Sequence, residues 1–206
     1  FWFFGATLLA QFPNFAKFTL HGDESVFILM LSIFSLGIGI GSLLCEKLSN
    51  HKVELGLVLF GGIGITLFGA DLYATSTAIQ TTLTAPALAY DYMLFLSSFS
   101  HLHLLADILF IGIFGGFYIV PLYAFIQSPR EKSHQARIIA ANNIMNALFM
   151  VVSALFSLWI FNLGFNIPQL FLATAILSAI VIAYLSIRHP DFLSRFLIWS
   201  SINRRK

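Results

Sequence analysis

The amino-acid sequence predicts an all-α membrane protein with six transmembrane helices. Of the 206 residues, 58% are hydrophobic and only 10% are charged, whereas a soluble domain carries about 25% charged residues. Long apolar stretches recur along the chain, and a membrane-spanning helix needs roughly 20 consecutive apolar residues. The Lys and Arg residues fall between these stretches in clusters, which gives the direction of each span.

Ten of the 11 basic residues can be placed on one side of the membrane. Cytoplasmic loops of membrane proteins concentrate Lys and Arg, so we expect this side, and both ends of the chain, to be cytoplasmic. The ten residues are Lys47, Lys52, Arg130, Lys132, Arg137, Arg188, Arg195, Arg204, Arg205 and Lys206. Lys17 is the exception, and it is therefore the first basic residue to suspect of a function.

The predicted spans form one bundle over residues 1–187. The polar turn 21–24 separates the first two, and Pro168 restricts the residue before it and opens the last. In chain order the spans are residues 1–20, 26–44, 53–73, 102–126, 138–163 and 169–187.

Two further segments are predicted not to span the membrane. Residues 74–88 contain Pro86 and read as an outer loop, and residues 89–99 are apolar but too short to cross. We expect this second stretch at the interface, with Tyr90, Tyr92 and Phe95 at headgroup level. The tail, residues 188–206, is predicted as a helix in the cytoplasmic interface or a linker; a plain stop-transfer tail fits equally.

Polar residues at membrane depth are costly and usually face a cavity or another helix. Gln11, Asn14 and Lys17 are each three residues from the next, so they share one face of the first span, beside a predicted kink at Pro13. We interpret this face as part of a substrate path. The alternative is that Lys17 extends to the interface while the two amides bond neighbouring helices.

The fourth span begins with His101, His103 and Asp107. His103 and Asp107 are four residues apart and can pair, and Asp107 is placed in the substrate path or in a proton relay. In the alternative, both His lie at the interface and Asp107 bonds a neighbouring helix. Two His and one Asp do not predict a metal site, and no cofactor is expected.

Amides and glycines mark other helix contacts. Asn142, Asn143 and Asn146 lie near the cytoplasmic end of the fifth span, where they favour a gating or packing role. Two groups of glycines are predicted to let helix backbones touch. These are Gly37, Gly39 and Gly41 in the second span and Gly112, Gly115 and Gly116 in the fourth.

No catalytic motif is present, so we do not expect an enzyme. Phosphate-binding glycine loops of the Walker or GxGxxG type are missing. The single Cys45 excludes an intrachain disulfide. A net charge of +2 does not indicate a nucleic-acid partner. Because the chain begins at Phe1 inside an apolar run, we expect a fragment of a longer protein.

Five segments carry a family resemblance. Residues 39–48, with the acid–base pair Glu46–Lys47, resemble a degenerate loop motif of the major facilitator superfamily. A second resemblance is to the lysophospholipid transporter branch of this superfamily. It is carried by residues 11–14, by residues 114–127 and by the following residues 137–146. Residues 190–197 resemble the linker of fusion proteins in which such a transporter precedes a glycerophospholipid acyltransferase.

The resemblance implies the C-terminal six-helix half of a major facilitator superfamily transporter. Such a protein moves lysophospholipids inward across the bacterial inner membrane by alternating access, together with a missing N-terminal six-helix half. On this basis Lys17 would attract the lipid phosphate and Asp107 the ethanolamine, with Gln11 and Asn14 along the path. Gly41 and the Glu46–Lys47 pair would act in gating.

Three other functions stay open. The chain can be the membrane domain of a bifunctional acyltransferase, although the His-x4-Asp signature is missing and catalysis would lie beyond Lys206. It can be a carrier of another cargo, for which abundant Phe favours an amphipathic molecule. A membrane anchor without transport is disfavoured by the intramembrane Lys, Asp and Asn residues.

Overall fold

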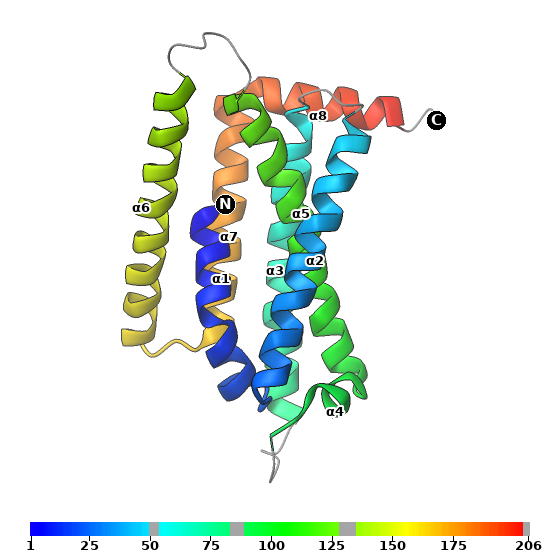
Figure 1. Cartoon of the computed structure of the whole chain (residues 1–206), viewed down its shortest axis with the longest axis vertical. Coiled ribbons are helices and arrows are strands. Elements are labelled where there is room, and N and C mark those ends of the chain that lie inside the picture. Colours follow the sequence, from blue (N-terminus) through cyan, green and yellow to red (C-terminus); the bar gives the residue numbers. More distant parts are fainter. Residues whose placement is uncertain (50–53, 83–88, 128–134, 204–206) are drawn as a thin grey trace.

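The computed structural model describes residues 1–49, 54–82, 89–127 and 135–203 (Figure 1). These residues confirm an all-α chain: they form helices and a single isolated β-bridge, with no strand. In chain order the elements are α1 (Trp2–Asn14), the π-helix η1 (Phe15–Thr19), α2 (Glu24–Leu48), α3 (Gly56–Thr82), α4 (Tyr92–Leu96), α5 (Phe99–Gln127), α6 (Gln135–Asn162), α7 (Ile167–Arg188) and α8 (Pro190–Asn203).

Five of the described helices are long and apolar enough to cross a membrane, namely α2, α3, α5, α6 and α7. The first predicted span instead forms 13 residues of α-helix and then the five-residue π-helix. The change in helix type follows Pro13, which lacks an N–H and disturbs the hydrogen bonds of the preceding turn. The irregularity expected there is therefore present as a π-helix.

The C-terminal end of α3 differs from the prediction. Residues 74–82, expected as loop, continue the helix to Thr82. Hydroxyl groups are accommodated there by bonding the preceding turn: Ser76 donates to the carbonyl of Leu72 at 2.6 Å, and Thr77 donates to that of Tyr73 at 2.8 Å. The Ser and Thr content therefore did not end the helix. The predicted loop around Pro86 lies outside the described residues.

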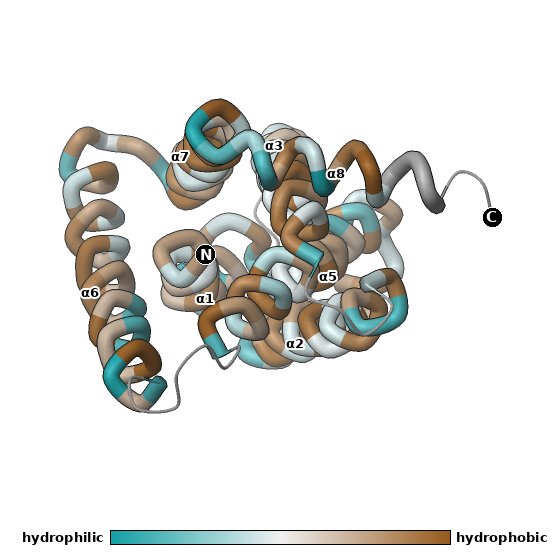
Figure 2. The backbone as a smooth tube through the Cα atoms, turned by 90° about the horizontal axis from the view of Figure 1, so that it is seen from above, coloured by the Kyte–Doolittle hydropathy of each residue, from teal (hydrophilic) through white to brown (hydrophobic). Residues whose placement is uncertain are grey.

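The helices form a bundle with α6 at one side (Figure 2). In its core, α5 packs against both α2 and α3, and α3 also packs against α7. The first segment of the chain, formed by α1 and η1, lies between this group and α6. It buries Phe12 and Phe15 completely. Phe15 contacts Phe171 of α7 edge to face, with 5.1 Å between ring centroids.

Glycines bring the backbones of α2 and α5 into direct contact. A Cβ added at Gly41 would overlap the carbonyl oxygen of Ile113, and one at Gly112 would lie 2.5 Å from the carbonyl oxygen of Phe34. Gly37 and Gly116 are packed in the same way. Gly39 does not take part, because a Cβ there would meet no atom within 4 Å.

This contrast gives a matched pair of substitutions on one helix. Gly41→Ala is expected to destabilise the protein by about 1–3 kcal/mol, because the methyl group forces α2 and α5 apart. Gly39→Ala places its methyl group in open space and is expected to gain about 0.5–1 kcal/mol of helix propensity. Thermal unfolding of the full-length protein in detergent measures both; equal effects would contradict the proposed contact.

Basic residues gather at one end of the bundle. Lys47 ends α2, Arg137 begins α6, and Arg188 ends α7, all at the end across which α8 lies, drawn at the top of Figure 1. α8 carries Arg195, and its Trp199 indole donates to the carbonyl of Leu48 at 3.1 Å. The described basic residues thus follow the predicted partition, with Lys17 again the exception. The assignment of this end to the cytoplasm stays a prediction.

At the opposite end, a backbone clasp joins the α2 entry to the segment before α4. The N–H of Tyr90 donates to the carbonyl of His21, and the N–H of Asp23 donates to that of Tyr90, both at 2.9 Å. His21 adopts a left-handed conformation, with φ 54°, to make this turn. Phe95 was expected at headgroup level but is fully buried, stacked 4.0 Å from His101.

Candidate functional site

The predicted polar face of the first segment lies at the surface of the bundle. Gln11 is half-buried, and Asn14 and Lys17 are exposed. The Asn14 amide donates to Gln11 Oε1 at 3.3 Å. The Lys17 ammonium lies 5.5 Å from the centroid of the Phe18 ring. These polar groups therefore do not pack into the core of their own bundle.

Lys17 lines a cavity of about 530 Å³ at the end of the bundle opposite α8. Asp23 and Glu24 line the same cavity, together with Pro13 and Phe27. Asp23 caps α2, because its Oδ1 accepts hydrogen bonds from the hydroxyl of Ser25 at 2.6 Å and from its N–H at 2.8 Å. The bond from the Ser25 hydroxyl is the main cause that lowers the pKa of Asp23 below its usual value. The cavity that Lys17 lines therefore also carries a negative charge.

A second cavity, of about 490 Å³, opens between the first segment, α5, α6 and α7. Its wall is largely apolar, and a polar group is set into it. In this group the amide oxygen of Asn146 faces three donors. It accepts hydrogen bonds from the Tyr123 hydroxyl at 2.8 Å, from Trp2 Nε1 at 3.0 Å and from Asn142 Nδ2 at 3.1 Å. Asn142 and Asn146, predicted for gating or packing, therefore both line a cavity and link three helices.

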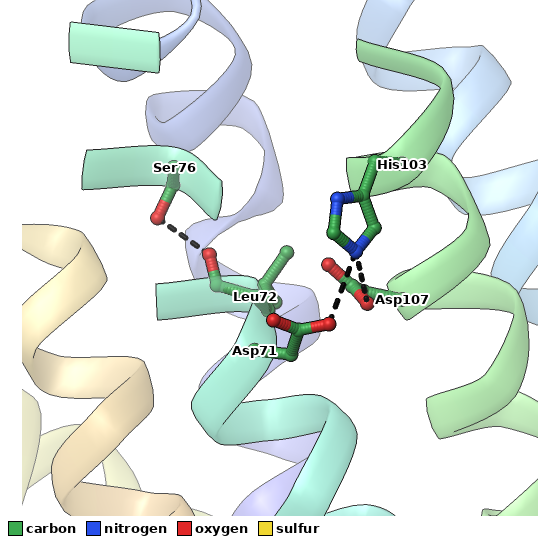
Figure 3. Close-up of polar contacts among 5 residues, drawn as sticks. All are labelled: Asp71, Leu72, Ser76, His103 and Asp107. Carbon is green, nitrogen blue, oxygen red and sulfur yellow. Dashed lines mark hydrogen bonds and ion pairs between the residues drawn. The ribbon is translucent and has the colours of Figure 1, made fainter. Parts of the chain in front are cut away.

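The third arrangement joins α3 and α5 (Figure 3). His103 Nε2 lies 3.1 Å from Asp71 Oδ2 and 3.9 Å from Asp107 Oδ1. The Asp107 side chain is only 2% exposed, and its Oδ2 has no hydrogen-bond partner among the described residues. The predicted pairing of His103 with Asp107 is thus part of a three-residue cluster, with α3 supplying the second carboxylate.

Asp71 was not among the site residues predicted from the sequence, although the sequence contained a signal for it. It is an acidic residue inside a stretch assigned to the membrane, and such residues are rare and usually functional. The predicted site residues at membrane depth were taken from the first, fourth and fifth spans, and Asp71 in the third span was not considered. The helix that contains Asp71 continues to Thr82.

The structure separates the other predicted site residues. Asp107 lies between α3 and α5 and is 1% exposed, and it does not line the Lys17 cavity. Gly41 packs on Ile113, whereas Glu46 and Lys47 are exposed at the basic end of α2. Asn143 is exposed on α6. The predicted path from Lys17 to Asp107 is therefore not one continuous site in this bundle.

Within the described residues, one group has the composition of a metal site. One ligand atom each from Asp71, His103 and Asp107 lies within 4.8 Å of the other two. The sequence predicted no metal site, because Asp71 was not counted with the two residues from α5.

Together these features indicate an all-α, multi-pass membrane protein with polar side chains buried between its apolar helices. No family model, no curated protein sequence and no solved structure matches this chain. A functional assignment therefore depends on the site itself.

Proposed function

We propose that this chain is the C-terminal six-helix half of a secondary transporter of the major facilitator superfamily and moves lysophospholipids across a bacterial inner membrane. The observation that carries the proposal is the polar face of Gln11, Asn14 and Lys17 at the surface of the bundle. In hydrocarbon such a face would be costly, since polar groups there require a partner or a water-filled route. A transport path along this face supplies both.

The shape and chemistry of the cavities favour an amphipathic cargo. The cavity beside Asn146 has the size of ordinary small-molecule sites and offers an apolar wall for an acyl chain. Tyr123 and the two Asn side chains supply hydrogen-bonding groups at one place on that wall. A sugar would need many more polar groups, because each buried hydroxyl requires a hydrogen-bond partner.

The Lys17 cavity offers both charges that a zwitterionic headgroup requires. Lys17 can bind the phosphate, and Asp23 with Glu24 can bind the ethanolamine ammonium. This assignment replaces Asp107 as the partner of the amine, because Asp107 lies in the α3–α5 contact. Charge-assisted hydrogen bonds of this kind are roughly twice as strong as neutral ones.

The peripheral position of α6 supports a second half as partner. Its exposed side chains include Ile144, Leu155 and Trp159, each more than half exposed. A large apolar surface beside a polar path is typical of a protein interaction site within the membrane as well as of lipid contact. In alternating access, two such halves rock about a site between them.

Uptake of labelled lysophospholipids into proteoliposomes that contain the full-length protein tests this function. We expect uptake of lysophosphatidylethanolamine, and a loss of about tenfold or more in Lys17→Ala, which corresponds to roughly 1.4 kcal/mol of lost binding. Glu24→Gln is expected to reduce the preference for ethanolamine over glycerol headgroups. Arg195→Ala, an exposed cation at the other end, serves as the control with normal uptake.

One outcome would reject the proposed cargo, and another would reject the assignment of the headgroup site. Absence of lysophospholipid uptake by the wild-type protein, with uptake of an unrelated amphipathic cation, would identify a carrier of another cargo. Equal uptake by the wild type, Lys17→Ala and Glu24→Gln would remove the headgroup assignment.

A further inference from the structure

The cluster on α3 and α5 contains more negative charge than its surroundings balance. Asp107 is buried on an apolar helix, and its Oδ2 has no partner among the described residues. Asp71, from the facing helix, is the second carboxylate. Two ionised carboxylates this close, in a medium of low dielectric constant, strongly favour a positive charge between them. His103 can supply only one.

The three side chains converge from two helices on one point. His103 lies one turn before Asp107 on α5, and Asp71 reaches toward both from α3 (Figure 3). Ligands of one tetrahedral ion, with bonds of about 2.0–2.2 Å, lie roughly 3.3–3.6 Å apart. The observed separations of 3.1 Å and 3.9 Å bracket this value. Small side-chain rotations would therefore complete the geometry.

We propose that Asp71, His103 and Asp107 bind a divalent transition-metal ion of the Zn²⁺ class. A neutral His and two carboxylates match a +2 ion in charge, so the occupied site would be electrically neutral. One imidazole nitrogen with two carboxylate oxygens suits Zn²⁺, Co²⁺ or Mn²⁺. Ca²⁺ and Mg²⁺ are disfavoured, because they prefer oxygen ligands in larger number.

Access and a remaining coordination position are also present. The side chains of Asp71 and His103 are both 46% exposed, so the ion can enter from the side opposite the buried Asp107. The three residues supply three ligand atoms, so a water molecule can fill the fourth position, as in zinc sites that keep an open position. The site would join α3 to α5 as a cross-link.

Titration of the full-length protein in detergent, after removal of metal with a chelator, tests the inference. We expect one Co²⁺ per chain, with the visible absorption of a tetrahedral ion, and displacement by Zn²⁺. Asp71→Asn, His103→Gln and Asp107→Asn are each expected to weaken binding by about tenfold or more. His189→Gln, a His outside the cluster, should bind as the wild type does.

A shift in thermal unfolding gives an independent measure. Zn²⁺ should raise the unfolding temperature of the wild type and of His189→Gln, but not that of the three cluster variants. Absence of a cobalt band in the folded wild type would overturn the proposal and leave a proton-exchanging cluster. Equal binding by His103→Gln and the wild type would overturn it as well. Neither result depends on lysophospholipid uptake, so the transport proposal is tested separately.

Discussion

Replacement of Asp107 by Asn is expected to stabilise the metal-free protein by about 1–3 kcal/mol. The substitution replaces a buried carboxylate by a neutral amide of the same size, and burying a charged group costs more than burying a neutral one. The substitution also removes the repulsion between Asp107 and the carboxylate of Asp71, which carries a like charge. Thermal unfolding in detergent with a chelator is the measurement. Most core substitutions destabilise, so the sign alone is informative.

The matched control is the same substitution at an exposed helix cap. Asp91 accepts a hydrogen bond from the N–H of Leu94 at 2.8 Å, and Asn caps a helix about as well as Asp. Asp91→Asn is therefore expected to change the stability by less than about 0.5 kcal/mol. If Asp107→Asn destabilised the protein instead, the contacts of the carboxylate with His103 and Thr75 would outweigh the cost of its burial.

A second large effect is expected when the cavity beside Asn146 is filled. Ser178 of α7 lines this cavity, and Ser178→Trp places an indole where we assign the acyl chain. Lysophospholipid uptake should fall about tenfold or more, because a loss of only ~1.4 kcal/mol in binding already gives this factor. Uptake by proteoliposomes at equal protein content is the measurement.

Ile187→Trp tests whether a new indole on α7 is harmful in itself. Ile187 lies on the same helix but is 82% exposed, so its substitution should leave uptake unchanged. Ser178→Ala removes the hydroxyl without filling space and should also transport. Normal uptake by Ser178→Trp would exclude this cavity as the site of the acyl chain.

Hydropathy was sufficient to predict the class of fold and the approximate position of each long helix. A helix in a membrane must satisfy its own backbone, so an apolar stretch of sufficient length has few alternatives. Helix ends were less predictable, since they depend on local hydrogen bonds. In α3, Ser76 and Thr77 bond the preceding turn and the helix continues.

The candidate sites required contacts between helices, which a single sequence does not supply. Asp71 and His103 are 32 residues apart and meet only because α3 packs against α5. Likewise Trp2 and Tyr123 are 121 residues apart. Spacing along one helix found His103 with Asp107 and Asn142 with Asn146. It could not show which side chain of another helix completes each group.

The backbone clasp between His21 and Tyr90 has a mechanical consequence. It couples the entry of α2 to the segment that leads into α5, at the end of the bundle where the Lys17 cavity opens. At the other end, Trp199 couples α8 to the last turn of α2. The clasp and the Trp199 contact therefore fix both ends of α2. Under the transport proposal we expect displacement to be largest in α6, which contacts the rest of the bundle mainly through α1.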